Sequence, residues 1–261
     1  MTDSTSIPSL AGQVALVTGA SREIGAAMAE ALAARGCAVL VSHYREPELA
    51  EAVVGRIRAA GGKAAAHAAD LADLGQARGL IEAALRNFGR LDIYAANAGL
   101  THWSPFLDYA EKDWDTVVDL NLKGSFFSAQ AAARQMAAQG QGGQIVFSAS
   151  VTGLRAIANG SAYGVTKAGL IHLARCLALE LAPHHIRVNA LAIGATVNER
   201  NLGDDPDYDR HWAAVTPAGR TARPADVARG LLFLIDNPIA TGSTLVLDGG
   251  WSNQSPVPGG P

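Results

Sequence analysis

Short apolar runs alternate with helix-forming stretches along almost the whole chain. The first run, at residues 14–18, ends at Gly19, and an alanine-rich stretch follows at 24–34. The alternation continues to residues 243–247, and neither a Pro/Gly/Ser-rich linker nor an internal repeat interrupts it. Because successive βα units build a parallel sheet with helices on both faces, the sequence predicts an α/β fold with one doubly wound sheet.

The pattern locates each expected element. Strands are predicted at residues 14–18, 38–42, 63–69, 91–96, 144–148, 187–193 and 243–247. Helices are predicted at 24–34, 48–60, 74–88, 111–136 (with a break near 122–124), 161–181 and 224–236. We therefore expect a single Rossmann-type domain over residues 13–252, between tails at 1–12 and 253–261. Residues 198–218 lack this periodicity, and we expect them to form a lid over the substrate.

Charge and composition exclude several classes of partner. Lys and Arg total 21 against 24 Asp and Glu, so no basic field attracts nucleic acid. Cys37 and Cys176 stand in apolar surroundings without metal-ligand spacing, which predicts free thiols and no metal site. No apolar run approaches the ~20 residues that cross a membrane. The first twelve residues lack the features of an export signal, so we expect a cytoplasmic protein.

A glycine-containing loop joins the first strand to the first helix, in the run Thr18-Gly-Ala-Ser-Arg-Glu-Ile-Gly25. At this position of a parallel sheet, helix amides and bare backbone face a bound pyrophosphate. Small residues are needed because the ligand must approach the main chain closely. The loop therefore indicates a dinucleotide site.

Tyr163 and Lys167 are four residues apart on a predicted helix, so they share one face of it. A free tyrosine has a pKa near ~10, and a neighbouring ammonium group favours the phenolate and lowers that pKa. Ser150 follows the fifth apolar run, with Ser148 as the competing serine. This set of side chains predicts general acid–base chemistry.

Together these motifs resemble the short-chain dehydrogenase/reductase family. The resemblance is carried by the glycine loop, Asp70-Leu71, Asn97-Ala-Gly99, Asn121, and Ser150 at the family's spacing from Tyr163-Gly-Val-Thr-Lys167. Glu23 stands where the family has its middle glycine. A carboxylate there repels a phosphate, so we expect Glu23 to point outward and the cofactor to bind less tightly.

The resemblance implies an NAD(P)-dependent enzyme (EC 1.1.1.-) that moves a hydride between nicotinamide and a carbon bearing a hydroxyl or carbonyl. Tyr163 would be the general acid or base, and Ser150 would bind the substrate oxygen. Lys167 would lower the Tyr163 pKa and hold the ribose, and Asn121 would link Lys167 to solvent through a water. The implied cofactor residues are Gly19, Ser21, Arg22, Ile24, Gly25, His43, Tyr44, Arg45, Asp70, Leu71, Asn97, Ala98, Gly99, Tyr163, Lys167, Gly194 and Thr196.

The second strand ends in Ser42-His-Tyr-Arg45, with His43 where an acid would bind the ribose of NAD. Arg22 and Arg45 are candidates to pair with the 2′-phosphate of NADP. We therefore expect NADP to be preferred, with NAD as the alternative. After the sixth strand, Ile193 replaces the family's proline and Asn198 its threonine.

His102 and Trp103 are predicted to contact the substrate together with Ser150 and Tyr163. Thr152, Arg155, Glu199, Arg200 and Trp212 are further candidates for the pocket wall. The runs at 131–136, 205–208 and 216–220 resemble members acting on sugars and polyols, such as aldose 1-dehydrogenases, so the expected substrate is a small alcohol or ketone, or a sugar. Two alternatives stay open: a 3-oxoacyl-thioester reductase, and a catalytically idle dinucleotide-binding redox sensor. Family resemblance also implies a homotetramer that pairs residues 111–136, 161–181 and the last strand.

Overall fold

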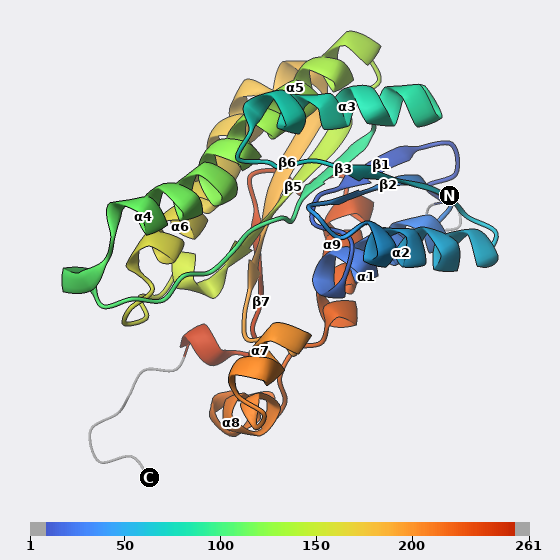
Figure 1. Ribbon diagram of the computed structural model, residues 1–261. Helices are drawn as coiled ribbons and strands as arrows, with labels where there is room; N and C mark the ends of the chain where they lie inside the picture. Colours follow the sequence, from blue (N-terminus) through green and yellow to red (C-terminus); the bar gives the residue numbers. More distant parts are fainter. Residues whose placement is uncertain (1–8, 254–261) are drawn as a thin grey trace.

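The computed structural model describes residues 9–253, which build one seven-stranded sheet (Figure 1). The strand order is β3-β2-β1-β4-β5-β6-β7, and every neighbouring pair is parallel. The strands are β1 (Val14–Val17), β2 (Ala38–His43), β3 (Lys63–Ala68), β4 (Ile93–Ala96), β5 (Gly143–Ser150), β6 (Ile186–Ile193) and β7 (Thr244–Leu247). The predicted α/β fold with a doubly wound parallel sheet is confirmed.

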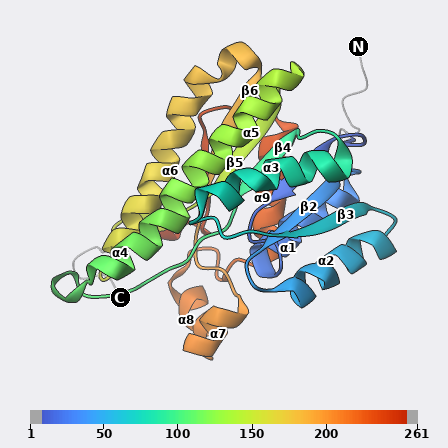
Figure 2. The same ribbon diagram turned by 45° about the horizontal axis from the view of Figure 1, so that its top comes forward.

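Helices cover both faces of the sheet, in two layers that Figures 1 and 2 show from different sides. One layer holds α1 (Glu23–Ala34), α2 (Pro47–Ala59) and α9 (Pro224–Asp236). The other holds α3 (Leu74–Phe88), α5 (Ser125–Gln139) and α6 (Ser161–Glu180). Successive strand residues point into opposite layers, since Leu16 packs in the second layer and Val17 in the first. Burial on both faces explains why the strands read as continuous apolar runs.

The strand order fixes where a ligand can enter. The chain proceeds outward from β1 through β2 to β3, and then returns to place β4 on the other side of β1. In open α/β sheets this reversal opens a crevice at the carboxyl ends of the strands. The glycine loop after β1 and the Asn97 segment after β4 flank that crevice.

The long helix predicted over residues 111–136 is interrupted by a wider turn. α4 (Glu111–Val118) passes into a π-helical turn at Asp119–Gly124, and the chain continues as α5. A Cβ on Gly124 would lie 2.4 Å from the backbone oxygen of Leu71, so a larger residue does not fit there. The predicted break is thus a π-turn that keeps the helix axis continuous while inserting one residue.

The segment expected to act as a lid contains two short helices, α7 (Glu199–Asp204) and α8 (Tyr208–Val215), at the carboxyl edge of the sheet (Figure 1). Asn198 begins α7, because its Oδ1 accepts a hydrogen bond from the Asn201 N–H at 2.7 Å. On α8, the ring of Trp212 packs edge-on against Trp251, with centroids 5.5 Å apart. This segment is therefore more regular than its sequence indicated.

Most residues of the two predicted tails, 1–8 and 254–261, lie outside the described residues. Leu10, within the range expected to be a tail, is buried, and its N–H donates to the Arg35 oxygen at 2.9 Å. Cys37 is buried, Cys176 is partly buried, and both are free thiols. Within residues 9–253, none of the helices combines the length and the apolar composition of a membrane-crossing segment.

Candidate active site

A cavity of about 1220 Å³ runs along the carboxyl edge of the sheet, between the strand ends and helices α7 and α8. This volume exceeds the ~300–1,000 Å³ of ordinary small-molecule pockets, so the cavity has room for more than one ligand. Its walls include most residues predicted from sequence: Gly19, Ser21, Arg22, Ile24, Gly25, His43, Tyr44, Asp70, Leu71, Asn97, Ala98, Gly99, Trp103, Ser150, Tyr163, Lys167, Gly194 and Thr196.

The glycine loop is held in shape by the neighbouring strand. Thr18 Oγ1 accepts hydrogen bonds from the N–H groups of Asn97 and Ala98, at 2.9 and 3.0 Å. A Cβ on Gly25 would lie only 2.1 Å from the Gly19 oxygen, so no side chain can replace that hydrogen. The loop thus presents bare backbone and the N-terminus of α1 to the cavity, which suits a pyrophosphate.

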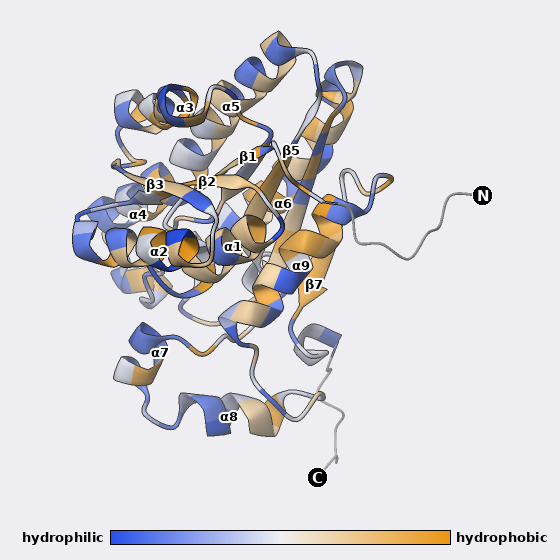
Figure 3. Ribbon diagram, turned by 90° about the vertical axis from the view of Figure 1, so that its right-hand side faces the viewer, coloured by the Kyte–Doolittle hydropathy of each residue, from blue (hydrophilic) through white to orange (hydrophobic). Residues whose placement is uncertain are grey.

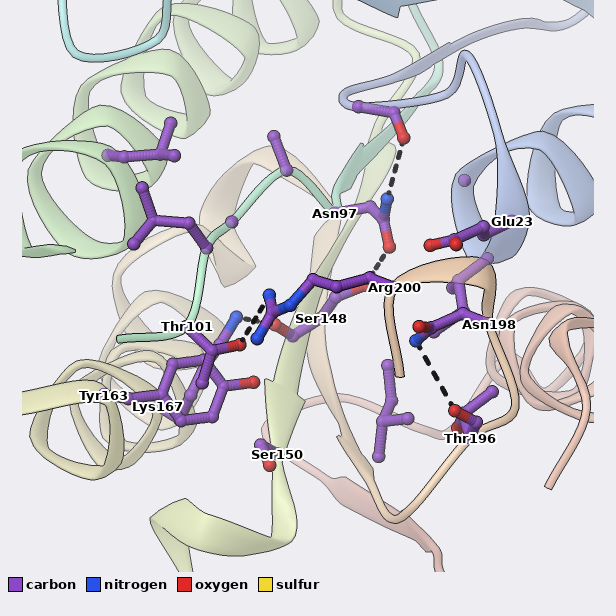
Figure 4. Close-up of a pocket in the computed structure, with 18 of the residues that line it drawn as sticks. Glu23, Asn97, Thr101, Ser148, Ser150, Tyr163, Lys167, Thr196, Asn198 and Arg200 are labelled. Atoms are coloured by element: carbon purple, nitrogen blue, oxygen red, sulfur yellow. Dashed lines mark hydrogen bonds between the residues drawn. The ribbon is translucent and has the colours of Figure 1, made fainter. Parts of the chain in front are cut away.

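Asn97 ties three strand ends together. Its Nδ2 donates to the backbone oxygens of Thr18 and Gly19, and its Oδ1 accepts from Ser148 Oγ at 3.2 Å (Figure 4). The Ser148 hydroxyl is therefore engaged by Asn97. Ser150, which is the last residue of β5, lies on the same side of the cavity as Tyr163.

Tyr163 and Lys167 lie on one face of α6 and both line the cavity (Figure 4). Lys167 Nζ is 5.4 Å from the centre of the Tyr163 ring and donates to the Ser148 backbone oxygen at 2.8 Å. The hydroxyl of Tyr163 points toward the space beside Ser150. A phenol, a hydroxyl and a buried amine therefore converge at one end of the cavity.

Burial governs the protonation of both groups. It lowers the pKa of Lys167 from 10.5 to about 8. Burial also raises the pKa of Tyr163, while hydrogen bonding with Ser150 and the charge of Arg200 act in the opposite direction. The expected lowering of the Tyr163 pKa by Lys167 is not found, because desolvation of the phenol prevails and the buried amine itself disfavours its charge.

Asn121 lies behind the cavity wall rather than in it. Its Oδ1 accepts from the Leu100 N–H at 2.9 Å, and its Nδ2 donates to the Leu100 oxygen at 2.8 Å. The side chain is completely buried in the π-turn. Both ends of the amide thus hold the segment after β4, and the water link to Lys167 that the resemblance implied stays a prediction.

Two predicted residues lie away from the cavity. The exposed Arg45 has a positive φ of 55°, and its guanidinium stacks on the Tyr44 ring at 4.8 Å. His102 lies 3.6 Å from Asp113 and packs edge-on against Tyr109. Neither side chain lines the cavity, so the contacts predicted for them with cofactor and substrate stay predictions.

Glu46 is a cavity residue that the sequence prediction missed. Its carboxylate lies 2.8 Å from an Arg22 guanidinium nitrogen and accepts from Ser21 Oγ at 2.5 Å. The prediction sought an acid only at position 43, whereas Glu46 stands at the start of α2. Pro47, in the first turn of that helix, was the available signal that α2 begins here, directly after Glu46.

Glu23 faces the cavity, which overturns the expectation that it points outward. Its φ is 53°, in the left-handed region that a glycine adopts without strain. Its Oε1 accepts a hydrogen bond from the backbone N–H of Glu199 at 2.8 Å. The residue in place of the usual glycine therefore contacts the first turn of α7.

The end of the cavity near Tyr163 has mixed walls. The Trp103 ring is tilted against Tyr163, with centroids 6.2 Å apart. From the other side, Arg200 reaches across from α7 and donates to Thr101 Oγ1 at 3.2 Å (Figure 4). Tyr208 and Trp212 of α8 complete this part of the wall. Such a surface provides both apolar contact and polar groups for a small hydroxylated molecule.

Known proteins resemble this chain over most of its length. A family model described as Enoyl-(Acyl carrier protein) reductase matches residues 19–252. The 2-dehydro-3-deoxy-D-gluconate 5-dehydrogenase of Dickeya dadantii is 35% identical, over 93% of this chain and 96% of the relative. A 3-oxoacyl-[acyl-carrier-protein] reductase of Synechocystis is 39% identical, over 92% and 97%. A crystal structure of a short chain dehydrogenase from Burkholderia cenocepacia in complex with NADP superposes with a TM-score of 0.88 at 34% identity, over 95% and 100%.

Proposed function

Because the chain belongs to the short-chain dehydrogenase/reductase family, we propose that it is an NAD(P)(H)-dependent oxidoreductase acting on a sugar or a related polyol. It would move a hydride between nicotinamide and a carbon that bears a hydroxyl or a carbonyl. The observation that carries this proposal is the convergence of Tyr163, Lys167 and Ser150 at one end of a cavity whose other end is the glycine loop.

The residues present fit the cofactor, since the glycine loop and the N-terminus of α1 line the same cavity as Tyr163 and Lys167. Bound nicotinamide would accept or supply the hydride. In reduction, the Tyr163 hydroxyl gives its proton to the substrate oxygen, and in oxidation the Tyr163 phenolate takes a proton from the substrate hydroxyl. Ser150 donates a hydrogen bond to the same oxygen, where negative charge develops. Lys167 is held by the Ser148 oxygen at 2.8 Å, close enough to Tyr163 to orient a ribose hydroxyl beside it.

The cofactor is NADP or NAD, and the Arg22–Glu46 pair sets the balance between them. Arg22 favours the 2′-phosphate of NADP, as the sequence indicated, but Glu46 already pairs with it at 2.8 Å. A 2′-phosphate would have to displace or repel Glu46 to reach the guanidinium. The 2′-hydroxyl of NAD, in contrast, is able to donate to Glu46 without disturbing the pair. The preference for NADP thus rests on Arg22 alone.

The named relatives guide the choice of substrate. The Dickeya relative is named for its action on a sugar acid, which supports a sugar or related compound as the substrate. The Synechocystis relative favours a second candidate function, reduction of a 3-oxoacyl thioester. A turnover assay with aldoses, polyols, sugar acids and acetoacetyl thioesters, each with both cofactors, separates the two. Oxidation of sugars or polyols is the expected result. Activity on the thioester alone would replace the first candidate with the second, and no turnover with any substrate would favour an idle redox sensor.

We also propose a homotetramer in the cytoplasm, where a pool of NAD(P)(H) serves the reaction. Figure 3 shows apolar residues gathered on α9 and β7. On these elements the side chains of Phe233 and Val246 are 55% and 39% exposed. A second copy would cover such a face. Light scattering coupled to size-exclusion chromatography would measure the mass, and a monomer at micromolar concentration would contradict this assembly.

A further inference from the structure

Arg200 lines the cavity and reaches Thr101 beside Tyr163 (Figure 4). Its side chain starts from the first turn of α7 and reaches Thr101, beyond β4, with a hydrogen bond of 3.2 Å. Its charge acts on two phenols in the cavity, favouring the ionised forms of both Tyr163 and Tyr208. A cation is therefore held within reach of the reacting end of a bound substrate.

The carboxylates near Arg200 neutralise its positive charge only weakly. Asp204 Oδ2 is 3.8 Å from Arg200 Nε, and the Asp204 side chain is 75% exposed, so water screens this pair. Asp205 is engaged elsewhere, because its Oδ2 lies 2.8 Å from His211 Nδ1. By contrast, Arg22 has Glu46 at 2.8 Å, at the other end of the cavity. Arg200 is therefore available at the substrate end. A bound anion would approach its guanidinium more closely than Asp204 does.

The backbone around Arg200 is fixed before any ligand binds. Asn198 caps α7 through the Asn201 N–H, and Glu23 accepts from the Glu199 N–H at 2.8 Å. Both bonds hold the first turn of α7, from which the Arg200 side chain extends. A group positioned in advance loses less conformational entropy when it binds its ligand.

We propose that Arg200 binds a carboxylate of the substrate and makes the enzyme selective for sugar acids over neutral sugars. The planar guanidinium matches the two oxygens of a carboxylate, and such charged bonds are stronger than neutral ones. A polyhydroxy acid whose reacting hydroxyl lies between Ser150 and Tyr163 extends its acid group toward Arg200. This inference deepens the proposed function and rests on it.

The test uses pairs of substrates that differ in one terminal group, a carboxylate or a hydroxymethyl, such as gluconate and sorbitol, with the wild-type chain and Arg200→Met. We expect kcat/KM to fall about 10- to 100-fold more for the acid than for the alditol, since only the acid loses a charged hydrogen bond. Arg200→Lys keeps the positive charge but lacks the paired N–H donors of the guanidinium, so it should recover part of the lost kcat/KM for the acid. Arg210→Met on α8 is the matched control, because Arg210 pairs with Asp207 at 2.9 Å and does not line the cavity.

Two further measurements separate the possible failures. The dissociation constant of NADPH, from its fluorescence, should be the same in wild type and Arg200→Met. A weaker NADPH complex, with equal losses for acid and alditol, would mean that Arg200 binds the cofactor's pyrophosphate and would overturn the proposal. Tryptophan fluorescence measures the binding of gluconate to the NADPH complex without turnover. This binding should be about 10-fold or more weaker in Arg200→Met. A wild-type enzyme that prefers alditols would overturn this inference and leave the proposed function intact.

Discussion

The carboxylate of Glu23 and the backbone N–H of Glu199 are joined by a hydrogen bond of 2.8 Å across 176 positions of the chain. Glu23 opens α1 beside the glycine loop, and Glu199 opens α7 over the substrate end of the cavity. The bond therefore connects the proposed cofactor loop to the proposed substrate helix. It also accounts for a side chain at a φ of 53°, where glycine would be less strained.

Replacing Glu23 with glycine should loosen α7 without lowering the stability of the whole fold. The substitution removes a charged hydrogen bond and, at the same time, relieves backbone strain. We expect amide exchange in residues 199–204 to accelerate about tenfold, while the melting temperature stays equal or rises. Glu23→Gln, which keeps an acceptor without the charge, should give an intermediate rate. Unchanged exchange in the glycine variant would show that the bond does not restrain α7.

The proposed role of Tyr163 predicts that Tyr163→Phe lowers kcat/KM by about 10²- to 10⁴-fold, the usual contribution of general acid–base catalysis. NADPH affinity should change little, because the lost hydroxyl points toward the substrate oxygen. Steady-state kinetics and a fluorescence titration check the two statements. Tyr109→Phe removes a hydroxyl outside the cavity and serves as the control. Near-normal turnover in Tyr163→Phe would remove the phenol from the mechanism.

The Arg22–Glu46 pair predicts opposite changes in cofactor preference. Glu46→Gln removes the charge that opposes a 2′-phosphate, so kcat/KM for NADP relative to NAD should rise about tenfold. Arg22→Gln should lower the same ratio, because it removes the group that a phosphate would pair with. The measurement is the ratio of the two kcat/KM values with one fixed substrate. If both variants shifted the ratio in the same direction, the pair would not discriminate between the cofactors.

Burial of Lys167 makes stability depend on pH in a defined window. Its pKa is about 8 in the folded chain and near 10.5 when unfolded, so between these values only the unfolded chain keeps the proton. Raising the pH from 8 to 10.5 should therefore increase the stability contribution of Lys167. Across this range the melting temperature of the wild type should rise relative to that of Lys167→Met. Below pH 8 the difference between the two melting temperatures should be constant. A flat difference throughout would mean that the amine is not desolvated.

Local patterns in the sequence were sufficient for the architecture. Apolar runs located the strands because both faces of a parallel sheet are buried. The i, i+4 spacing placed Tyr163 and Lys167 on one helical face because 3.6 residues form a turn. Each of these signals acts within a few residues.

The errors at the candidate site come from interactions that no local pattern carries. The contact of Glu23 with Glu199 depends on how two distant loops meet, so no local pattern predicts it. Arg45 follows β2, and its guanidinium stacks on Tyr44 of the cavity wall instead of lining the cavity itself. Burial likewise reversed the pKa shift expected for Tyr163, because desolvation depends on the surrounding fold rather than on the residue one turn away.

The π-turn at Asp119–Gly124 limits how homologous chains are able to vary in length. Deleting one residue there would restore regular α-helical winding and rotate Asn121 by about 100° relative to the helix that follows. Its amide would then leave Leu100, and the segment after β4 would lose its anchor. Surface loops of this fold are free to gain or lose residues during evolution, whereas this interior turn must keep its number of residues.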